Sequence, residues 1–340
     1  MTRHAWVNRA LGVAEGTGLI NLLQRTNPGT GRDLYVLAYH RIEEPGGRSW
    51  LNPDNISTTP RDFEAQMRLV ADRYHPVAAN EVLEAARGGA PLPRDAVLVT
   101  VDDGYRDFLD TTFPVCSRYG IHPLLFVPTA YVGAGTFWWD KVYQIIFLSG
   151  QTEIETPIGR LGPIAEGDRF RALHQLIRAL KQMPFDRVEN WVETTHASAV
   201  HLPEEQNHNT LTWDELRRLS QQGVTVASHT HTHPILTQIP PAEAQQQIRL
   251  SQAILQRELG TAVPIFAFPD GKPQAYSAAL IEMLYAEGFE ILFLLVNGRA
   301  VIQPGTHRLT LPRLAVWRNQ TLPQFHLRLT PFIDLQKTRA

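Results

Sequence analysis

Apolar-rich runs alternate with amphipathic stretches along most of this chain. The runs predict buried strands, and they lie at 34–39, 96–101, 124–127, 224–228, 264–268 and 289–296. Between them, hydrophobic residues recur at helical spacing, as Phe63, Met67 and Val70 do within 60–73. Thr212 and Glu215 form a capping box that opens another predicted helix. Short buried strands in alternation with helices indicate an α/β fold, either a barrel or an open parallel sheet.

Residues from about 134 to 210 break this alternation and read as a mainly helical insertion. We expect an N-terminal extension over 1–32, a barrel over 33–316 that carries the insertion, and a C-terminal helical tail over 317–340. Because the insertion leaves the barrel just after a predicted strand, it should pack beside the carboxyl ends of the strands. Its Trp138-Trp139 pair fits either the core of the insertion or an aromatic stacking platform for a ligand.

Composition narrows the function classes. The chain has 340 residues, 43% of them hydrophobic and 19% charged, which is typical of a globular protein. Its 32 basic against 34 acidic residues leave a formal charge of −2, so neither a nucleic acid nor an anionic membrane is an expected partner. The single cysteine, Cys116, excludes an intramolecular disulfide and a cysteine-rich zinc site. We see no signal peptide or membrane span and expect a cytoplasmic protein. Its oligomeric state is left open.

Polar residues with catalytic chemistry follow four of the predicted strands. Asp102 and Asp103 follow 96–101, His229 follows 224–228, Asp270 follows 264–268 and His40 follows 34–39. In a parallel α/β fold these positions lie on the carboxyl-end rim, where active sites are built.

The histidine cluster His229-Thr230-His231-Thr232-His233 has the density of a metal site, since three imidazoles occur within five residues. A chance polar loop or a pH-sensitive patch is the alternative. The adjacent pair Asp102-Asp103 can cap a helix, or can divide the work of metal ligand and general base. Spacing alone does not decide which of these side chains bind.

Two of these motifs resemble those of the polysaccharide deacetylases, carbohydrate esterases of family four. Residues 100–104 resemble the family's T-F-D-D-G motif, and residues 229–234 match H-[S/T]-x-x-H-[P/S]. The resemblance implies a distorted (β/α) barrel of seven to eight strands. It also implies that Asp102 is the general base and that Asp103, His229 and His233 bind a divalent metal ion. His231 falls on a variable position of the motif.

Residues 266–271 resemble the family's third motif, in which the backbone N–H after the proline contributes to an oxyanion hole. The resemblance therefore places Pro269 and Asp270 beside the substrate. Two residues depart from the motif, because Ala267 stands where the family has arginine and Asp270 stands where it has tyrosine.

A general acid is the last residue that the resemblance implies. The family takes it from a late L-x-H motif, which residues 292–297 lack. A circularly permuted subgroup, similar to poly-N-acetylglucosamine deacetylases, supplies it from a Tyr-His pair on the first strand. Tyr39-His40 matches that pair, so we expect His40 to be the acid and Tyr39 to lie beside the substrate. His307 is the alternative acid, and a structural core histidine is the alternative reading of His40.

The expected function is that of a metal-dependent hydrolase that removes N-acetyl groups from an amino-sugar polysaccharide, oligosaccharide or glycan precursor. One divalent ion is implied; we expect zinc, although an aspartate and two imidazoles also suit cobalt, nickel or iron. The departures at Ala267 and Asp270 motivate an alternative, an amidase that acts on a non-sugar carbon–nitrogen bond. An inactive glycan-binding module is a further alternative.

Overall fold

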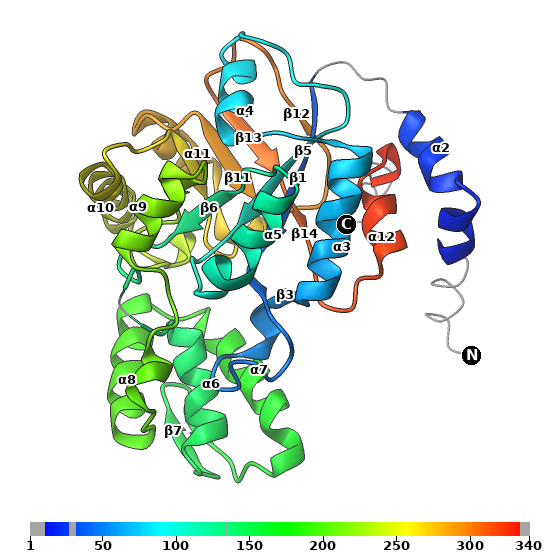
Figure 1. The fold of residues 1–340 in the computed structure, drawn as a ribbon. Helices are drawn as coiled ribbons and strands as arrows, with labels where there is room; N and C mark the ends of the chain where they lie inside the picture. The colour runs from blue at the N-terminus through cyan, green and yellow to red at the C-terminus, as the bar shows by residue number, and fades with distance from the viewer. Residues whose placement is uncertain (1–10, 27–31, 134, 334–340) are drawn as a thin grey trace.

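Parallel strands closed into a barrel form the centre of the molecule (Figure 1). This computed structural model describes residues 11–26, 32–133 and 135–333. Neighbouring strands follow the order β1-β5-β6-β9-β10-β11-β13, all paired in parallel. The strands are β1 (Asp33–Tyr39), β5 (Ala96–Val101), β6 (Leu124–Val127), β9 (Thr225–Ser228), β10 (Ile265–Ala267), β11 (Ile291–Leu294), β13 (Leu309–Pro312) and β14 (Leu314–Ala315).

The stretch around Arg313 closes the ring. β13, just before this residue, pairs with β11, and β14, just after it, pairs with β1. β4 (His75–Pro76) and β12 (Ala300–Val301) add short pairings to β5 and β1. The α/β class and the barrel of seven to eight strands are therefore confirmed, and the open sheet is excluded.

Alternate residues of each strand face the barrel interior, because successive side chains of a strand point to opposite sides. Leu98, Phe126, Phe293 and Leu311 belong to this interior cluster. The helix α4 (Ala79–Ala86) packs its apolar side chains against the same cluster, at the end of the barrel away from the insertion (Figure 1).

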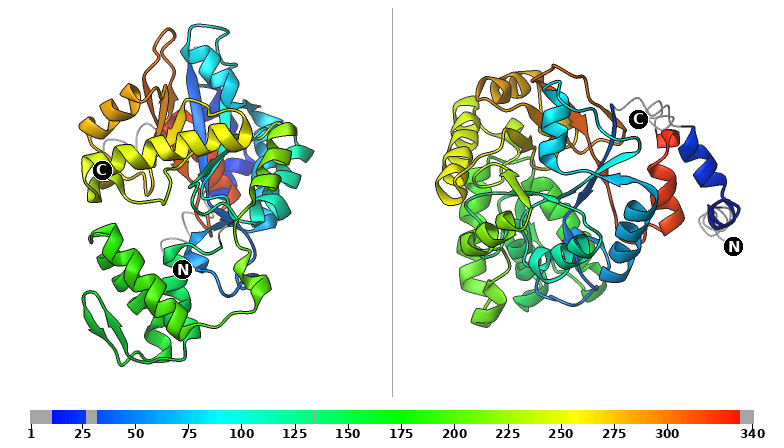
Figure 2. Two further views of the ribbon diagram at one scale, coloured as in Figure 1. Left: turned by 90° about the vertical axis from the view of Figure 1, so that its left-hand side faces the viewer. Right: turned by 45° about the horizontal axis from the view of Figure 1, so that its top comes forward.

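Helices cover the outside of the barrel. They are α3 (Pro60–Arg73), α5 (Phe113–Arg118), α9 (Trp213–Gln221), α10 (Pro241–Leu259), α11 (Ala278–Ala286) and α12 (Leu322–Arg328). The predicted stripe Phe63, Met67 and Val70 is buried on α3, and the predicted capping box opens α9. α2 (Leu19–Arg25) and α12 lie side by side in Figure 1 and in the right-hand view of Figure 2. No helix in the described part of the chain is long and apolar enough to cross a membrane.

Three helices and a hairpin project from one end of the barrel (Figure 2). They are α6 (Trp138–Leu148), β7 (Ile154–Thr156), β8 (Gly159–Leu161), α7 (Arg169–Leu180) and α8 (Phe185–Ala199). This insertion follows β6 and precedes α9, and it packs around its own buried cluster, which includes Ile145, Leu173 and Val192. The segment between β2 (Arg41–Ile42) and β3 (Ile56–Thr58) contacts it through the backbone N–H of Asn52, which donates to Asp140 Oδ1 at 2.8 Å.

Candidate metal centre and active site

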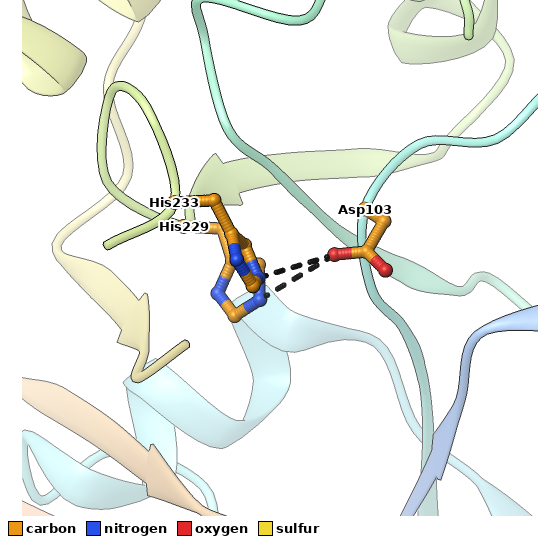
Figure 3. A group of neighbouring side chains, drawn as sticks. All are labelled: Asp103, His229 and His233. Carbon is orange, nitrogen blue, oxygen red and sulfur yellow. Dashed lines mark ion pairs between the residues drawn. The ribbon is translucent and has the colours of Figure 1, made fainter. Parts of the chain in front are cut away.

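Asp103, His229 and His233 converge just beyond the ends of β5 and β9 (Figure 3). Their ligand atoms all lie within 4.8 Å of one another, and Asp103 Oδ1 lies 3.4 Å from His233 Nε2 and 3.8 Å from His229 Nε2. Tetrahedral ligands about 2.0–2.2 Å from one zinc ion stand roughly 3.4 Å apart. The separations therefore fit a shared divalent ion.

The hydrogen bonds of this trio leave the ligand atoms free. His229 Nδ1 lies 2.8 Å from the carbonyl oxygen of Ala267, and since a carbonyl only accepts, Nδ1 donates and Nε2 keeps its lone pair. Asp103 Oδ1 is buried and accepts no hydrogen bond from any described residue. Burial, with His233 alongside, lowers the pKa of His229 to about 4. The imidazole is therefore neutral near pH 7, as a metal ligand must be.

The backbone is strained where it presents these side chains. Asp103, Thr230, His233 and Asp270 have φ angles of 74°, 70°, 62° and 61°, in the left-handed region that side chains other than glycine rarely adopt. Such strain clusters at functional sites, where the surrounding structure has to maintain it.

Asp102 is buried beside the trio and is held by an arginine. Arg313 Nη1 donates to Asp102 Oδ1 at 2.6 Å, and Nη2 donates to Asp102 Oδ2 at 2.8 Å. The same Nη1 also donates to Thr100 Oγ1 at 3.1 Å. Burial alone would raise the pKa of the Asp102 carboxyl, but the Arg313 charge, with smaller help from His229, holds it well below its usual range. Asp102 is therefore ionised throughout the neutral range.

The motifs do not indicate Arg313, which is only 1% exposed. It is placed by strand alternation, since Leu309 and Leu311 face the barrel interior and Arg313 comes two residues later. The same alternation turns Asp102 inward after Leu98. Pairing across the closed barrel, which local sequence does not reveal, brings the two residues together.

His40 lies at the site but outside the metal-ligating trio. Its Nε2 is 3.9 Å from Asp102 Oδ2, so it stands beside this carboxylate, and its ring is about one-third exposed. His307 is elsewhere: its Nδ1 contacts Glu290, directly before β11, whereas the site residues follow the strands. The structure therefore brings His40 to the cavity and leaves His307 outside it.

Tyr39 and His231 point away from the trio. Tyr39 is buried on the outer side of β1, where its hydroxyl donates to Gln66 at 2.8 Å and its ring packs edge-on against Phe63. Residues 39 and 40 face opposite sides of the strand, so the structure does not place Tyr39 beside a substrate. His231 Nδ1 lies 2.9 Å from Thr129 Oγ1, and this ring is not part of the metal-ligating group.

The carboxylate of Asp270 is neutralised by the insertion. Lys181, at the end of α7, places its Nζ 2.8 Å from Asp270 Oδ1, and Lys272 Nζ lies 3.6 Å from the same oxygen. Although burial alone would raise it, these two ammonium groups lower the pKa of Asp270. The departure from the tyrosine of the motif is thus accompanied by a lysine from a distant segment.

A cavity of about 520 Å³ joins the barrel rim to the insertion, and Asp103, His229 and Asp270 line it. Trp138 and Trp139 line it as well, although they are only 7% and 8% exposed. The Trp139 ring lies 4.8 Å from the His233 ring, and Trp139 Nε1 donates to the Tyr105 hydroxyl. Both tryptophans therefore pack in the core of the insertion and also form part of the cavity wall.

Comparison with known proteins shows which family this chain is similar to. Residues 171–290, which include both histidines of the trio, match the family model described as polysaccharide deacetylase. Over 84 residues the chain is 32% identical to poly-beta-1,6-N-acetyl-D-glucosamine N-deacetylase of Escherichia coli K12. That match spans 25% of this chain and 12% of the relative, so the chain aligns with only a small part of that protein.

Solved structures extend the likeness to the whole fold. The Streptococcus pyogenes deacetylase PplD has a TM-score of 0.57 at 17% identity, covering 88% of this chain and 98% of that one. IcaB from Ammonifex degensii has a TM-score of 0.56 at 19% identity, covering 88% and 97%. The matching sequence model and the shared barrel together confirm the resemblance of this chain to the polysaccharide deacetylase family that its two motifs indicate.

Proposed function

We propose that this protein is a metal-dependent hydrolase that removes N-acetyl groups from an amino-sugar glycan, either a polysaccharide, an oligosaccharide or a glycan precursor. The observation that carries the proposal is the convergence of Asp103, His229 and His233 beside an arginine-held Asp102 on one cavity. The name of the Escherichia coli relative supports N-acetylglucosamine as the sugar.

Asp103, His229 and His233 would hold one divalent ion, which we propose is zinc. The fit rests on the unbonded, buried Asp103 Oδ1 and on the free Nε2 of His229. When bound there, such an ion polarises a carbonyl and lowers the pKa of a water. Cobalt, nickel and iron fit the same ligand set.

In this proposal the remaining site residues transfer protons and stabilise the charge that develops during the reaction. Asp102, kept ionised by Arg313, accepts a proton from the attacking water. The backbone amide of Asp270 donates to the developing oxyanion, while its carboxylate is occupied by Lys181. His40 delivers a proton to the leaving nitrogen, and the products are acetate and a free amino sugar.

The test is release of acetate and primary amine from N-acetylglucosamine oligomers by the zinc-loaded protein. Asp102→Asn should keep the metal and lose about 10²–10⁴-fold in kcat, the usual worth of general-base catalysis. Acetate release without Asp102 would contradict its role. If the protein hydrolyses simple acetamides but releases no acetate from the sugar oligomers, the non-sugar amidase is favoured. That candidate is motivated by Asp270, which stands where the family motif has tyrosine.

A further inference from the structure

The helix α7 is tied to two separate segments that follow strands of the barrel. Near its middle, His174 Nε2 lies 2.7 Å from Asp54 Oδ2. At its end, Lys181 Nζ lies 2.8 Å from Asp270 Oδ1. All four residues line the cavity that holds the candidate metal ligands.

The two anchoring points lie on opposite sides of the barrel. Asp54 lies in the segment that follows β1 and β2, and Asp270 follows β10. Around the closed ring, β10 is three strands from β1 through β11 and the β13–β14 stretch, and four through β9, β6 and β5. A helix fixed at both points therefore crosses the carboxyl-end rim.

The length of helix between His174 and Lys181 and the residues that line the cavity agree with such a crossing. Seven residues separate His174 from Lys181, which is about 10 Å of helix at 1.5 Å per residue. Ile177 and Arg178, between the two anchors, also line the cavity, and Met183 extends the wall just beyond α7. Residues of the barrel and residues of this helix therefore both form walls of the cavity.

The volume of the space under α7 limits what it can hold. About 520 Å³ lies in the range of roughly 300–1,000 Å³ that is typical of clefts and cavities for one small ligand. A long glycan lying across the metal centre would need an open groove on both sides of the reacting sugar. Here one helix, held by Lys181 and His174, stands over the path between Asp54 and Asp270.

We propose that α7 restricts the substrate to a short oligosaccharide or to the end of a glycan chain, and that Lys181 and His174 determine this specificity. The inference rests on the proposed function and adds the substrate class. Of the two pairs, Lys181–Asp270 is the stronger constraint, because its side chains are 34% and 11% exposed against 56% and 39% for His174–Asp54.

The experiment compares short N-acetylglucosamine oligomers with the matching long polymer, using the full-length zinc-loaded protein. Tandem mass spectrometry of partly deacetylated oligomers locates the free amines. The wild-type protein should expose amines at one chain end and should favour oligomers over polymer. Lys181→Ala, and more so its combination with His174→Ala, should raise the polymer-to-oligomer ratio of kcat/KM by about tenfold or more.

Lys141→Ala is the matched control, because Lys141 pairs with Glu193 at 2.6 Å and both partners belong to the insertion. Its ratio should stay at the wild-type value. Amines distributed along the interior of chains by the wild-type protein would overturn the inference while leaving the proposed function standing.

A second readout needs no turnover and no variant. Trp138 and Trp139 line the cavity, so tryptophan fluorescence can report oligomer binding to the protein. Affinity should stop rising once the oligomer exceeds the cavity, and a continuing rise with chain length would overturn the inference. Length-limited binding without any acetate release would overturn the proposed function instead.

Discussion

At the scale of single residues, the contact between Arg313 and Asp102 sets the charge of the proposed base. Arg313→Ala leaves a buried carboxylate without its bidentate partner, so desolvation raises the pKa of Asp102. The acidic limb of kcat/KM should move to higher pH, and kcat/KM should fall by about tenfold for each pH unit below the raised pKa. Arg313→Lys keeps the positive charge but cannot make the bidentate contact, so it should recover part of the lost kcat/KM. An unchanged pH profile in the Ala variant would assign Arg313 a purely structural role.

Metal content tests the ligand trio. Asp103→Ala, His229→Ala and His233→Ala should each lose bound zinc, because three protein ligands are needed to hold one catalytic ion. His231→Ala is the control within the same loop, since its ring faces Thr129. The measurement is zinc per chain by atomic absorption, and equal zinc loss in the control would show that the ligand assignment is wrong.

The proposed acid is tested by its pH signature. A general acid has to carry its proton in order to donate it, so activity that depends on one is lost on the alkaline side of the pH profile. His40→Ala should retain zinc, lower kcat and remove this alkaline limb. His307→Ala, at the exposed contact with Glu290, should keep the wild-type profile. The opposite pattern would transfer the role to His307.

At the scale of elements, local patterns predict most of the barrel. Buried strands such as 96–101 are continuous apolar runs, and the stripe on α3 and the capping box of α9 depend on neighbouring residues alone. Motif residues at strand ends were likewise predictable, since parallel strands share a carboxyl edge. This reasoning fails for Tyr39, which the Tyr-His motif led us to expect beside the substrate together with His40. Adjacent residues of a strand point to opposite sides, so the two side chains do not reach the same site.

The carboxyl group of Asp140, on α6, is buried where this helix packs against residues that follow the barrel strands. Asp140 accepts hydrogen bonds from the Tyr105 hydroxyl at 2.6 Å and from the Asn52 amide. Burial, opposed in part by the Arg41 charge, raises the pKa of Asp140 to about 6. The folded state therefore binds this proton more tightly than the unfolded state, so the contribution of Asp140 to stability grows as pH falls from 7 toward 4.

Asp140→Asn removes this dependence. A rise of about two pKa units corresponds to about 3 kcal/mol, so the free energy of unfolding of the wild type relative to the variant should increase by roughly 2–3 kcal/mol between pH 7 and pH 4. Urea unfolding at several pH values measures the difference. Asp186→Asn, at an exposed position of α8, is the control for the loss of one carboxylate. If the difference in free energy of unfolding between wild type and Asp140→Asn stays constant with pH, the pKa of Asp140 is not raised in the folded protein.

At the scale of the whole molecule, the site depends on contacts between distant segments. Arg313 meets Asp102 only because the ring closes, and Lys181 meets Asp270 only because the insertion folds back over the rim. Neither pair has a local sequence signal, since each joins residues from separate elements. The departure at Asp270, which in the sequence alone is a carboxylate beside a developing oxyanion, becomes an anchor for α7 in the folded protein.

The central claim is that this barrel hydrolyses an N-acetyl group at the Asp103–His229–His233 site. Titration of zinc into chelator-stripped protein, with acetate release from N-acetylglucosamine oligomers followed at each addition, tests it most directly. Acetate release should rise in proportion to zinc and level off near one ion per chain, and Asp103→Ala should stay inactive throughout. Full loading of the wild type without acetate release, or release that needs neither zinc nor Asp103, would contradict it.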